Sequence, residues 1–329
     1  MKRYILVALS LVVLNLILLT TTIKADENVC RVLALGGGGD RGAYEVGVLK
    51  ALIELQAPEE TRYDIMSGVS AGALNIGAFG QYAIGQEKEA LANLENIWRT
   101  IKKGDIYNQW FPGGVVEGLM IKKGIFDSSP ERTFIKKHIQ PERYATTNRT
   151  LLAGTTELSS NRFIIYNNSE PIGIFAQALK ASSAVPGVFE PEVINGKPYT
   201  DGGSIHMSTV SSAIAACKDK YPHKKVKVDV VLCVSEIPFP SILDRFTNSI
   251  SILLHTVFNA ISGMLVRDVQ DAKHAYPEAE IRTISPSIFL PGWFLGFDHI
   301  PETIDLGYQD GKAAIKQAME KQRLSKLWK

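Results

Sequence analysis

The sequence predicts an α/β protein with three layers, in which a mainly parallel sheet lies between two layers of helices. Short apolar runs alternate along the chain with longer runs whose apolar residues recur at helical spacing. This alternation favours right-handed strand–helix–strand units, which build parallel sheets covered on both faces. The chain has 329 residues, of which 45% are hydrophobic, so it can bury a large core, and no linker divides it.

Each expected element follows from the hydrophobic pattern of its segment. Residues 226–234 are apolar on both faces, which is typical of a strand inside a sheet, and residues 104–130 carry the glycine, proline and aromatic residues of an irregular insertion. Strands or extended segments are expected at 31–35, 63–67, 151–156, 163–166, 193–199, 226–234 and 280–284. Helices are expected at 43–56, 71–82, 87–101, 174–183, 241–275 and 303–322.

The first 25 residues have the pattern of a secretory signal peptide. Two basic residues precede an apolar stretch from Tyr4 to Leu19, and Ala25 stands before Asp26. We expect cleavage of residues 1–25 and a secreted or lumenal protein. The alternative is an uncleaved signal anchor, because about sixteen apolar residues approach the length of a membrane span.

The charge of the chain gives no sign of a nucleic-acid partner. The formal net charge of the whole chain is +2, and it becomes −1 without residues 1–25, which hold three basic residues and no acid. The basic excess therefore belongs to the leader, and we expect no binding to nucleic acid.

Three cysteines cannot all pair within one chain. Secretion would permit one disulfide among Cys30, Cys217 and Cys233. Two of them lie in apolar segments, where a buried free thiol is common. The sequence therefore slightly favours the absence of a structural disulfide.

Residues 68–72, G-V-S-A-G, stand between a predicted strand and a predicted helix. Glycines on both sides of Ser70 allow the tight turn of a nucleophile elbow, which exposes the serine Oγ to a pocket. The helix that starts there directs its N-terminal amides at an anion formed during attack. Ser70 is therefore the candidate nucleophile.

The glycine run at residues 36–42 has two possible functions. Gly37, Gly39 and Gly42 match the dinucleotide-binding pattern G-x-G-x-x-G between a strand and a helix. That function also needs an acid at the end of the next strand. Asp64 has nearly the right spacing but stands at the start of its strand, away from the ligand crevice.

We favour the second function of this run, which is an oxyanion hole. The amides of Gly37, Gly38 and Gly39 would then face the oxygen that becomes charged when Ser70 attacks an ester carbonyl. Arg41 would brace the loop or contact a substrate phosphate.

Asp201 is the candidate base for Ser70. It opens a D-G-G turn after the extended segment 193–199, and the two glycines allow the turn to present the carboxylate. None of the six histidines stands in a motif typical of a triad histidine. The stretch at residues 180–191, K-A-S-S-A-V-P-G-V-F-E-P, precedes the D-G-G turn.

Together these motifs resemble the patatin-like phospholipases. The glycine loop, the elbow, the A-S-x-A-x-P-x-x-F-x-P stretch and D-G-G occur in the order and spacing of that family, over residues 30–320. The resemblance implies one patatin-like α/β/α domain over these residues and a dyad of Ser70 and Asp201. It also implies hydrolysis of acyl esters of phospholipids or neutral lipids without calcium, and we expect no cofactor. The supporting loop residues are Arg41, Gly42, Gly68, Gly72, Gly202 and Gly203.

The chain departs from the family pattern after D-G-G. The family usually has asparagine and proline at the positions of Met207 and Thr209, and the change is expected to loosen the loop that positions Asp201. This departure leaves a catalytically silent lipid-binding protein as the alternative function. An oxidoreductase built on the glycine run is a third hypothesis.

Two aromatic loop segments are candidates for contact with a lipid interface. They are residues 110–112, W-F-P, and residues 289–295, F-L-P-G-W-F-L. The alternative is that their aromatic side chains fill the core. Residues 250–265 are strongly apolar, but Asn259 and His255 favour a core helix over a membrane span.

Overall fold

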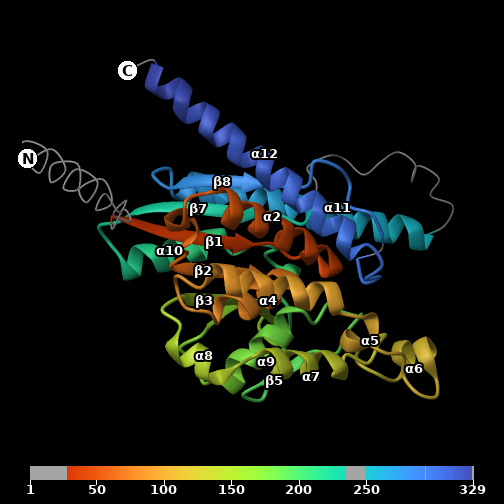
Figure 1. The fold of residues 1–329 in the computed structure, drawn as a ribbon. Helices are drawn as coiled ribbons and strands as arrows, with labels where there is room; N and C mark the ends of the chain where they lie inside the picture. Colours follow the sequence, from red (N-terminus) through yellow and green to blue (C-terminus); the bar gives the residue numbers. More distant parts are fainter. Residues whose placement is uncertain (1–27, 235–248, 293, 328–329) are drawn as a thin grey trace, which may run out of the picture.

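The computed structural model describes residues 28–234, 249–292 and 294–327 (Figure 1). The signal-peptide prediction for residues 1–25 and the first part of the predicted helix at 241–275 lie outside the described residues. In the described part, helices cover both faces of a mostly parallel sheet, so the predicted fold class is confirmed. None of the described helices is long and apolar enough to cross a membrane.

The sheet has eight strands in the order β5-β6-β3-β2-β1-β7-β8, with β4 also paired to β3. The neighbours from β3 to β8 in this order are parallel, whereas β4, β5 and β6 form antiparallel pairs. The strands are β1 (Val29–Leu35), β2 (Ile65–Val69), β3 (Thr150–Glu157), β4 (Arg162–Asn167), β5 (Glu192–Ile194), β6 (Lys197–Asp201), β7 (Lys225–Val231) and β8 (Glu280–Ile284).

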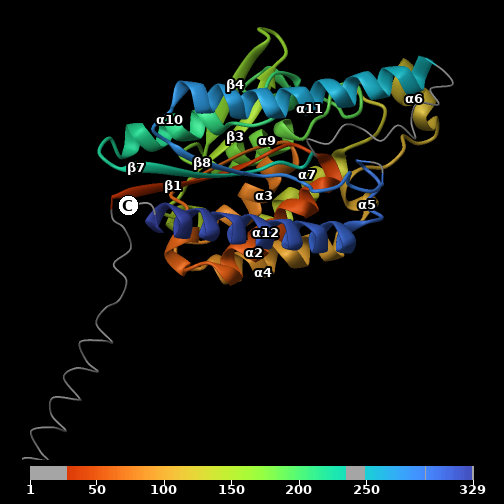
Figure 2. The same ribbon diagram turned by 90° about the horizontal axis from the view of Figure 1, so that it is seen from above.

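Two apolar cores, one on each face, hold the helices against the sheet. In β1, Leu33 and Leu35 belong to one core and Val32 and Ala34 to the other, because successive side chains point to opposite faces. Figure 2 shows α2 (Gly42–Leu55), α4 (Glu87–Thr100) and α12 (Ile300–Leu327) on one side and α10 (Val210–Lys220) and α11 (Ser249–Ala275) on the other. The remaining α-helices are α3 (Ala71–Gly80), α5 (Lys103–Ile106), α6 (Gly114–Met120), α7 (Ser129–His138), α8 (Pro141–Thr146) and α9 (Ile172–Ser182).

Two segments are more ordered than the sequence pattern indicates. The segment at 104–130 contains the short helix α6 and the end of α5, and the extended segment at 193–199 is part of a hairpin of β5 and β6. The predicted strand at 280–284 coincides with β8. The sequence pattern does not predict α10, whose residues between Val210 and Ile214 are two serines and an alanine.

The expectation that the chain lacks a structural disulfide is wrong. Cys30 in β1 and Cys217 in α10 form a disulfide across a Cα–Cα distance of 6.2 Å. Both side chains are fully buried in the core between the sheet and α10. Cys233 is a buried free thiol. The apolar surroundings that favour a free thiol therefore also accommodate this cross-link.

The disulfide is expected to stabilise the fold, because it closes a loop of 187 residues in the unfolded chain. Replacing both Cys30 and Cys217 by alanine should lower the free energy of unfolding by about 2–4 kcal/mol. Urea unfolding with and without dithiothreitol measures this effect. Reductant should lower the midpoint of the wild type and leave that of the double variant unchanged, and an equal response of both proteins would contradict the prediction.

Candidate active site

One edge of β3 brings Ser70 and Asp201 together. β4 occupies one edge of β3, so β2 and β6 share the other. β2 runs along this edge as far as Val69, which pairs with Gly154. β6 begins its pairing at the next position, where Asp201 pairs with Thr155. Because Ser70 directly follows Val69, the two candidate catalytic residues are neighbours.

Ser70 has the backbone geometry of a nucleophile elbow. Its φ of 55° and ψ of −126° lie in a region that side-chain-bearing residues rarely adopt, directly before the first residue of α3. A Cβ on Gly68 would lie 2.4 Å from the carbonyl group of Gly72, and one on Gly72 would lie 2.6 Å from the carbonyl oxygen of Leu35. Only glycine therefore fits at these two positions of the turn.

Ser182, at the end of α9, fixes the position of the elbow. The Ser70 N–H donates to Ser182 Oγ at 2.9 Å, and that hydroxyl donates to the carbonyl oxygen of Gly154 at 2.7 Å. Two residues further on, the carbonyl oxygen of Ala184 accepts the N–H of Asp201 at 2.9 Å. The A-S-x-A stretch thus holds the backbones of the candidate nucleophile and the candidate base in one hydrogen-bonded unit.

The Asp201 carboxyl lies in a buried environment that raises its pKa. The residue is only 4% exposed, and burial raises the pKa to about 7. Hydrogen bonds from the Gly203 N–H, at 2.7 Å, and from the Ser70 side chain act in the opposite direction. A carboxyl with this pKa is a much stronger base than an exposed aspartate, and it already contacts the group that it would deprotonate.

A buried ion pair next to Asp201 also affects the pKa of its carboxyl. Lys180 Nζ in α9 lies 3.0 Å from Glu131 Oε2 in α7, and both side chains are 2% exposed. The negative charge of Glu131 raises the pKa of Asp201, and the positive charge of Lys180 lowers it. No sequence motif points to Glu131, although Lys180 stands at the start of the stretch that precedes D-G-G.

The glycine loop is only partly consistent with the predicted oxyanion hole. The Gly37 N–H donates to the carbonyl oxygen of Met207 at 3.1 Å. This donor is engaged in this structure, so it would face an oxyanion only after the hydrogen bond to Met207 breaks. Gly38 and Gly39 remain the candidate donors of the loop. Gly39 has a φ of 63° and packs against the carbonyl oxygen of Phe294, where no Cβ fits.

Arg41 and the segment at 289–295 belong to the packing around the glycine loop. Arg41 is 6% exposed and lies over the ring of Phe289, with 5.0 Å between its guanidinium carbon and the ring centroid. This burial agrees with bracing the loop rather than contacting a phosphate. Leu290 and Leu295 are buried, which for these two residues agrees with the alternative that the segment fills the core. Residue 293 lies outside the described residues.

The remaining supporting glycines lie where neighbouring segments approach closely. A Cβ on Gly42, at the start of α2, would lie 2.8 Å from the ring of Trp98. A Cβ on Gly202 would lie 2.5 Å from the carbonyl oxygen of Gly154. Both positions thus accept only a residue without a side chain.

The loop after D-G-G is packed and anchored, in contrast to the loosening expected from Met207 and Thr209. Met207 is 6% exposed and its sulfur fills the space beside Gly203. Asp268 in α11 accepts the Ser208 N–H at 3.0 Å and contacts His206 Nδ1 at 2.8 Å. Met207 therefore contacts both the glycine loop and the D-G-G turn. Asp268 connects the residues on either side of Met207 to α11.

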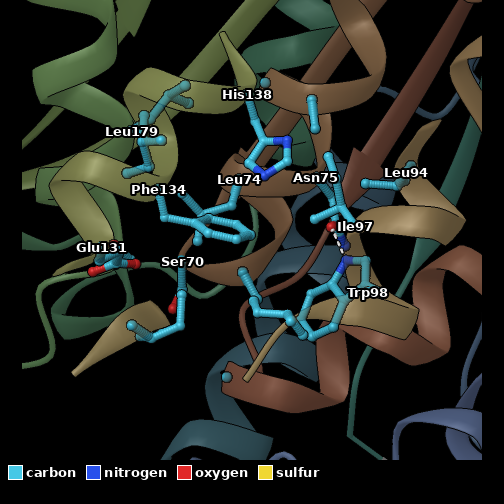
Figure 3. Close-up of a pocket in the computed structure, with 18 of the residues that line it drawn as sticks. Ser70, Leu74, Asn75, Leu94, Ile97, Trp98, Glu131, Phe134, His138 and Leu179 are labelled. Atoms are coloured by element: carbon cyan, nitrogen blue, oxygen red, sulfur yellow. Dashed lines mark hydrogen bonds between the residues drawn. The ribbon is translucent and has the colours of Figure 1, made fainter. Parts of the chain in front are cut away.

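An apolar cavity of about 90 Å³ lies beside Ser70. Figure 3 shows Leu74 and Phe134 in its wall, and Trp98 in the wall donates its Nε1–H to Asn75 Oδ1 at 2.7 Å. Its lining is mainly aliphatic and aromatic, as in pockets for apolar ligands. The further lining residues include Ala78, Leu94, Ile97, Ile101, Ile106, Ile135, Ile139, Leu179, Val185, Phe189, Leu295 and Phe297.

Other candidate residues from the sequence do not join this site. Asp64 accepts the backbone N–H of Arg31 at 2.9 Å, at the opposite end of β1 from the glycine loop, which argues against a dinucleotide site. His138 lines the cavity, but Figure 3 shows it apart from Ser70, with Phe134 between them. Among the described residues, no group of three or more His, Cys, Asp or Glu side chains is placed to hold a metal ion.

Comparison with known proteins adds a family match and several relatives. The family model for patatin-like phospholipases matches residues 33–214, which include Ser70 and Asp201. Calcium-independent phospholipase A2-gamma of Homo sapiens is 25% identical over 213 residues, which cover 58% of this chain and 26% of that protein. This chain thus spans about a quarter of the length of that relative. The cUMP-AMP-activated phospholipase of Escherichia coli is 27% identical over 241 residues, covering 67% of this chain and 70% of that protein.

The solved structure of VipD from Legionella pneumophila is more distant. It is 12% identical and covers 88% of this chain and 67% of its own, with a TM-score of 0.41. This similarity is too low to support an argument about function.

The buried Asp201 carboxyl is expected to reduce stability at neutral pH. Its pKa is about 7 in the folded chain and 3.8 ordinarily, so between these values the unfolded chain loses the proton first and stability falls as pH rises. Asp201→Asn should therefore raise the free energy of unfolding, by up to about 4 kcal/mol above pH 7 and by little below about pH 4. Urea unfolding of both proteins across this range measures the difference. A gain that does not depend on pH would contradict the assigned cause.

Proposed function

Because the chain belongs to the patatin-like phospholipase family, we propose that it is a lipid acyl hydrolase with Ser70 as nucleophile and Asp201 as general base. The observation that carries the proposal is the contact of a strained serine with a buried carboxyl of raised pKa, beside an apolar cavity. Relatives named as phospholipases support the same reaction class.

The proposed reaction has two steps that use the same pair of residues. Ser70 Oγ attacks the ester carbonyl carbon while its proton passes to the Asp201 carboxylate. The carbonyl oxygen becomes an oxyanion facing the N–H groups of Gly38 and Gly39 and the N-terminus of α3. When the intermediate collapses, the leaving alcohol takes the proton from Asp201. Water then attacks the acyl-enzyme, Asp201 accepts its proton, and Ser70 recovers that proton as the fatty acid leaves.

The cavity beside Ser70 favours an acyl ester as the substrate. Its aliphatic and aromatic lining would bind hydrocarbon and exclude water from the acyl-enzyme. This lining bears on the acyl chain and not on the head group, so phospholipids and neutral lipids both remain in the proposed substrate class. Such an enzyme meets its substrate at a lipid surface.

We also propose that the chain enters the secretory pathway, as its first 25 residues indicate. The Cys30–Cys217 disulfide supports this, because structural disulfides persist mainly in oxidising compartments.

The assignment of Ser70 and Asp201 predicts the loss of activity on substitution. Ser70→Ala should abolish covalent labelling by a fluorophosphonate, and Ser70→Ala and Asp201→Asn should each reduce ester hydrolysis by about a thousandfold or more. Gel-based labelling and a fluorogenic ester assay measure these effects. Ser159→Ala, in an exposed turn, is the matched control for the serine. Near-normal hydrolysis by either active-site variant would disprove the mechanism, and an unlabelled wild type would favour a silent lipid-binding protein.

The ion pair beside Asp201 predicts opposite changes in the pH dependence of hydrolysis. Asp201 must be ionised to accept a proton, so kcat/KM should fall below about pH 7. Glu131→Gln removes a negative neighbour and should move this limb to lower pH, whereas Lys180→Met removes a positive neighbour and should move it to higher pH. The double variant should lie between them. Shifts of both single variants in the same direction would contradict this assignment.

A further inference from the structure

The segment at residues 109–124, here called the α6 arm, exposes an unusual set of apolar side chains. Phe111 is 94% exposed, Met120 79% and Ile121 77%. The exposed members of the set also include Val115, Val116 and Leu119. Large apolar side chains exposed together on a soluble surface mark a site of interaction.

The backbone of the arm explains why these side chains point outward. In α6 only Gly118 is buried, and a Cβ there would lie 2.3 Å from the carbonyl oxygen of Ile125. The helix thus packs Gly118 against the residues that follow the arm from Ile125, here called the stem. Its large residues point away from the protein. A β-bridge between Asn108 and Asp127 closes the base of the arm.

The charges on the arm complement a negatively charged surface. Lys122 and Lys123 follow the apolar residues and are exposed. The one acid of the arm, Glu117, pairs with Lys122, whose Nζ lies 3.3 Å away, and accepts the Gly113 N–H at 3.0 Å, so the net positive charge of the arm is that of Lys123. At the adjacent α5, the exposed Lys102 and Lys103 outnumber Asp105, so this segment adds one net positive charge. Apolar residues bordered by lysines are typical of segments that insert into the interface of anionic membranes.

The arm lies at the end of the molecule that carries the candidate active site. In Figure 1, α5 and α6 project beyond the carboxyl end of β1, the end that leads into the glycine loop. The stem is attached to the same end, because the N–H groups of Ile125 and Phe126 donate to the carbonyl oxygens of Gly187 and Val188, each at 3.0 Å. Ile106 and Phe189, beside this stem, line the cavity at Ser70.

We infer that the α6 arm inserts into the surface of an anionic lipid membrane and holds the end of the molecule that carries the candidate active site against it. The role of this insertion rests on the proposed lipid hydrolase function. The evidence for the insertion itself is the exposure and charge of the arm. A second copy of the chain is the competing occupant. The lysines and the attachment of the arm to the cavity wall favour the membrane.

A local probe tests the insertion directly. Leu119→Cys, labelled with an environment-sensitive dye in the Ser70→Ala chain, should show a blue shift and increased emission on vesicles of phosphatidylcholine with phosphatidylglycerol. The same dye at Leu324→Cys, an exposed position in α12, should show no change. The absence of a spectral change at position 119 would overturn the inference, whatever else binds the vesicles.

A set of matched variants tests whether the arm carries the binding. Replacing Val116, Leu119, Met120 and Ile121 by serine should weaken vesicle binding roughly tenfold or more. Hydrolysis of a soluble short-chain ester should remain unchanged. The control replaces four exposed apolar residues elsewhere, Leu158, Val193, Met319 and Leu324, by serine. Equal weakening in both variants would overturn the inference.

Two further readouts separate the remaining explanations. Lys122→Gln with Lys123→Gln should reduce the preference for phosphatidylglycerol over phosphatidylcholine alone, and an unchanged preference would overturn the anionic part of the inference. Light scattering would detect self-association that depends on the arm. Self-association of this kind by a protein that does not bind vesicles would favour a second copy of the chain as the occupant. Vesicle binding by a wild type that hydrolyses no ester would refute the proposed function and leave the arm inference standing.

Discussion

The candidate site depends on the pairing register along one edge of β3. β2 ends on this edge at Val69, and β6 begins its pairing at the following position with Asp201. A shift of β6 by two residues would keep its side chains on the same faces but move the carboxyl by roughly 7 Å, beyond hydrogen-bond reach of Ser70. The proximity of Ser70 and Asp201, the proposed dyad, is therefore set by strand pairing, and the elbow and the D-G-G turn only refine it.

This arrangement places several unfavourable features in one small region. Ser70 has a positive φ, the Asp201 carboxyl is buried, and Lys180 and Glu131 bury opposite charges next to it. Each is costly alone. The hydrogen bonds of Ser182 and the close contacts of the glycines offset that cost, because they stabilise the single backbone geometry in which these features occur. Functional sites are where consistency with local preferences is expected to fail.

The sequence was sufficient for the features that depend on short-range pattern, and insufficient for those that depend on distant segments. The elbow and D-G-G could be predicted because each needs glycine at fixed offsets from one reactive side chain. The disulfide could not, because its cysteines are 187 residues apart. The hydrogen bond of the Gly37 N–H could not be predicted either, because its acceptor, the carbonyl oxygen of Met207, lies far away in the sequence. Likewise, the large side chains of α6 point outward because Gly118 packs against the stem. A helix of seven residues is too short for its hydrophobic periodicity to predict this.

The stretch at residues 180–191 connects the candidate active site to the α6 arm. Its first part holds the Asp201 backbone through Ala184, and its middle part holds the stem of the arm through Gly187 and Val188. The cavity of about 90 Å³ is smaller than the roughly 150 Å³ of an engineered cavity that binds benzene. A long acyl chain, the proposed ligand, would exceed this volume, so its binding would require the cavity to widen. Because Ile106 and Phe189 form part of that wall beside the stem, the arm, the wall and the Asp201 backbone are connected through the same short stretch of chain.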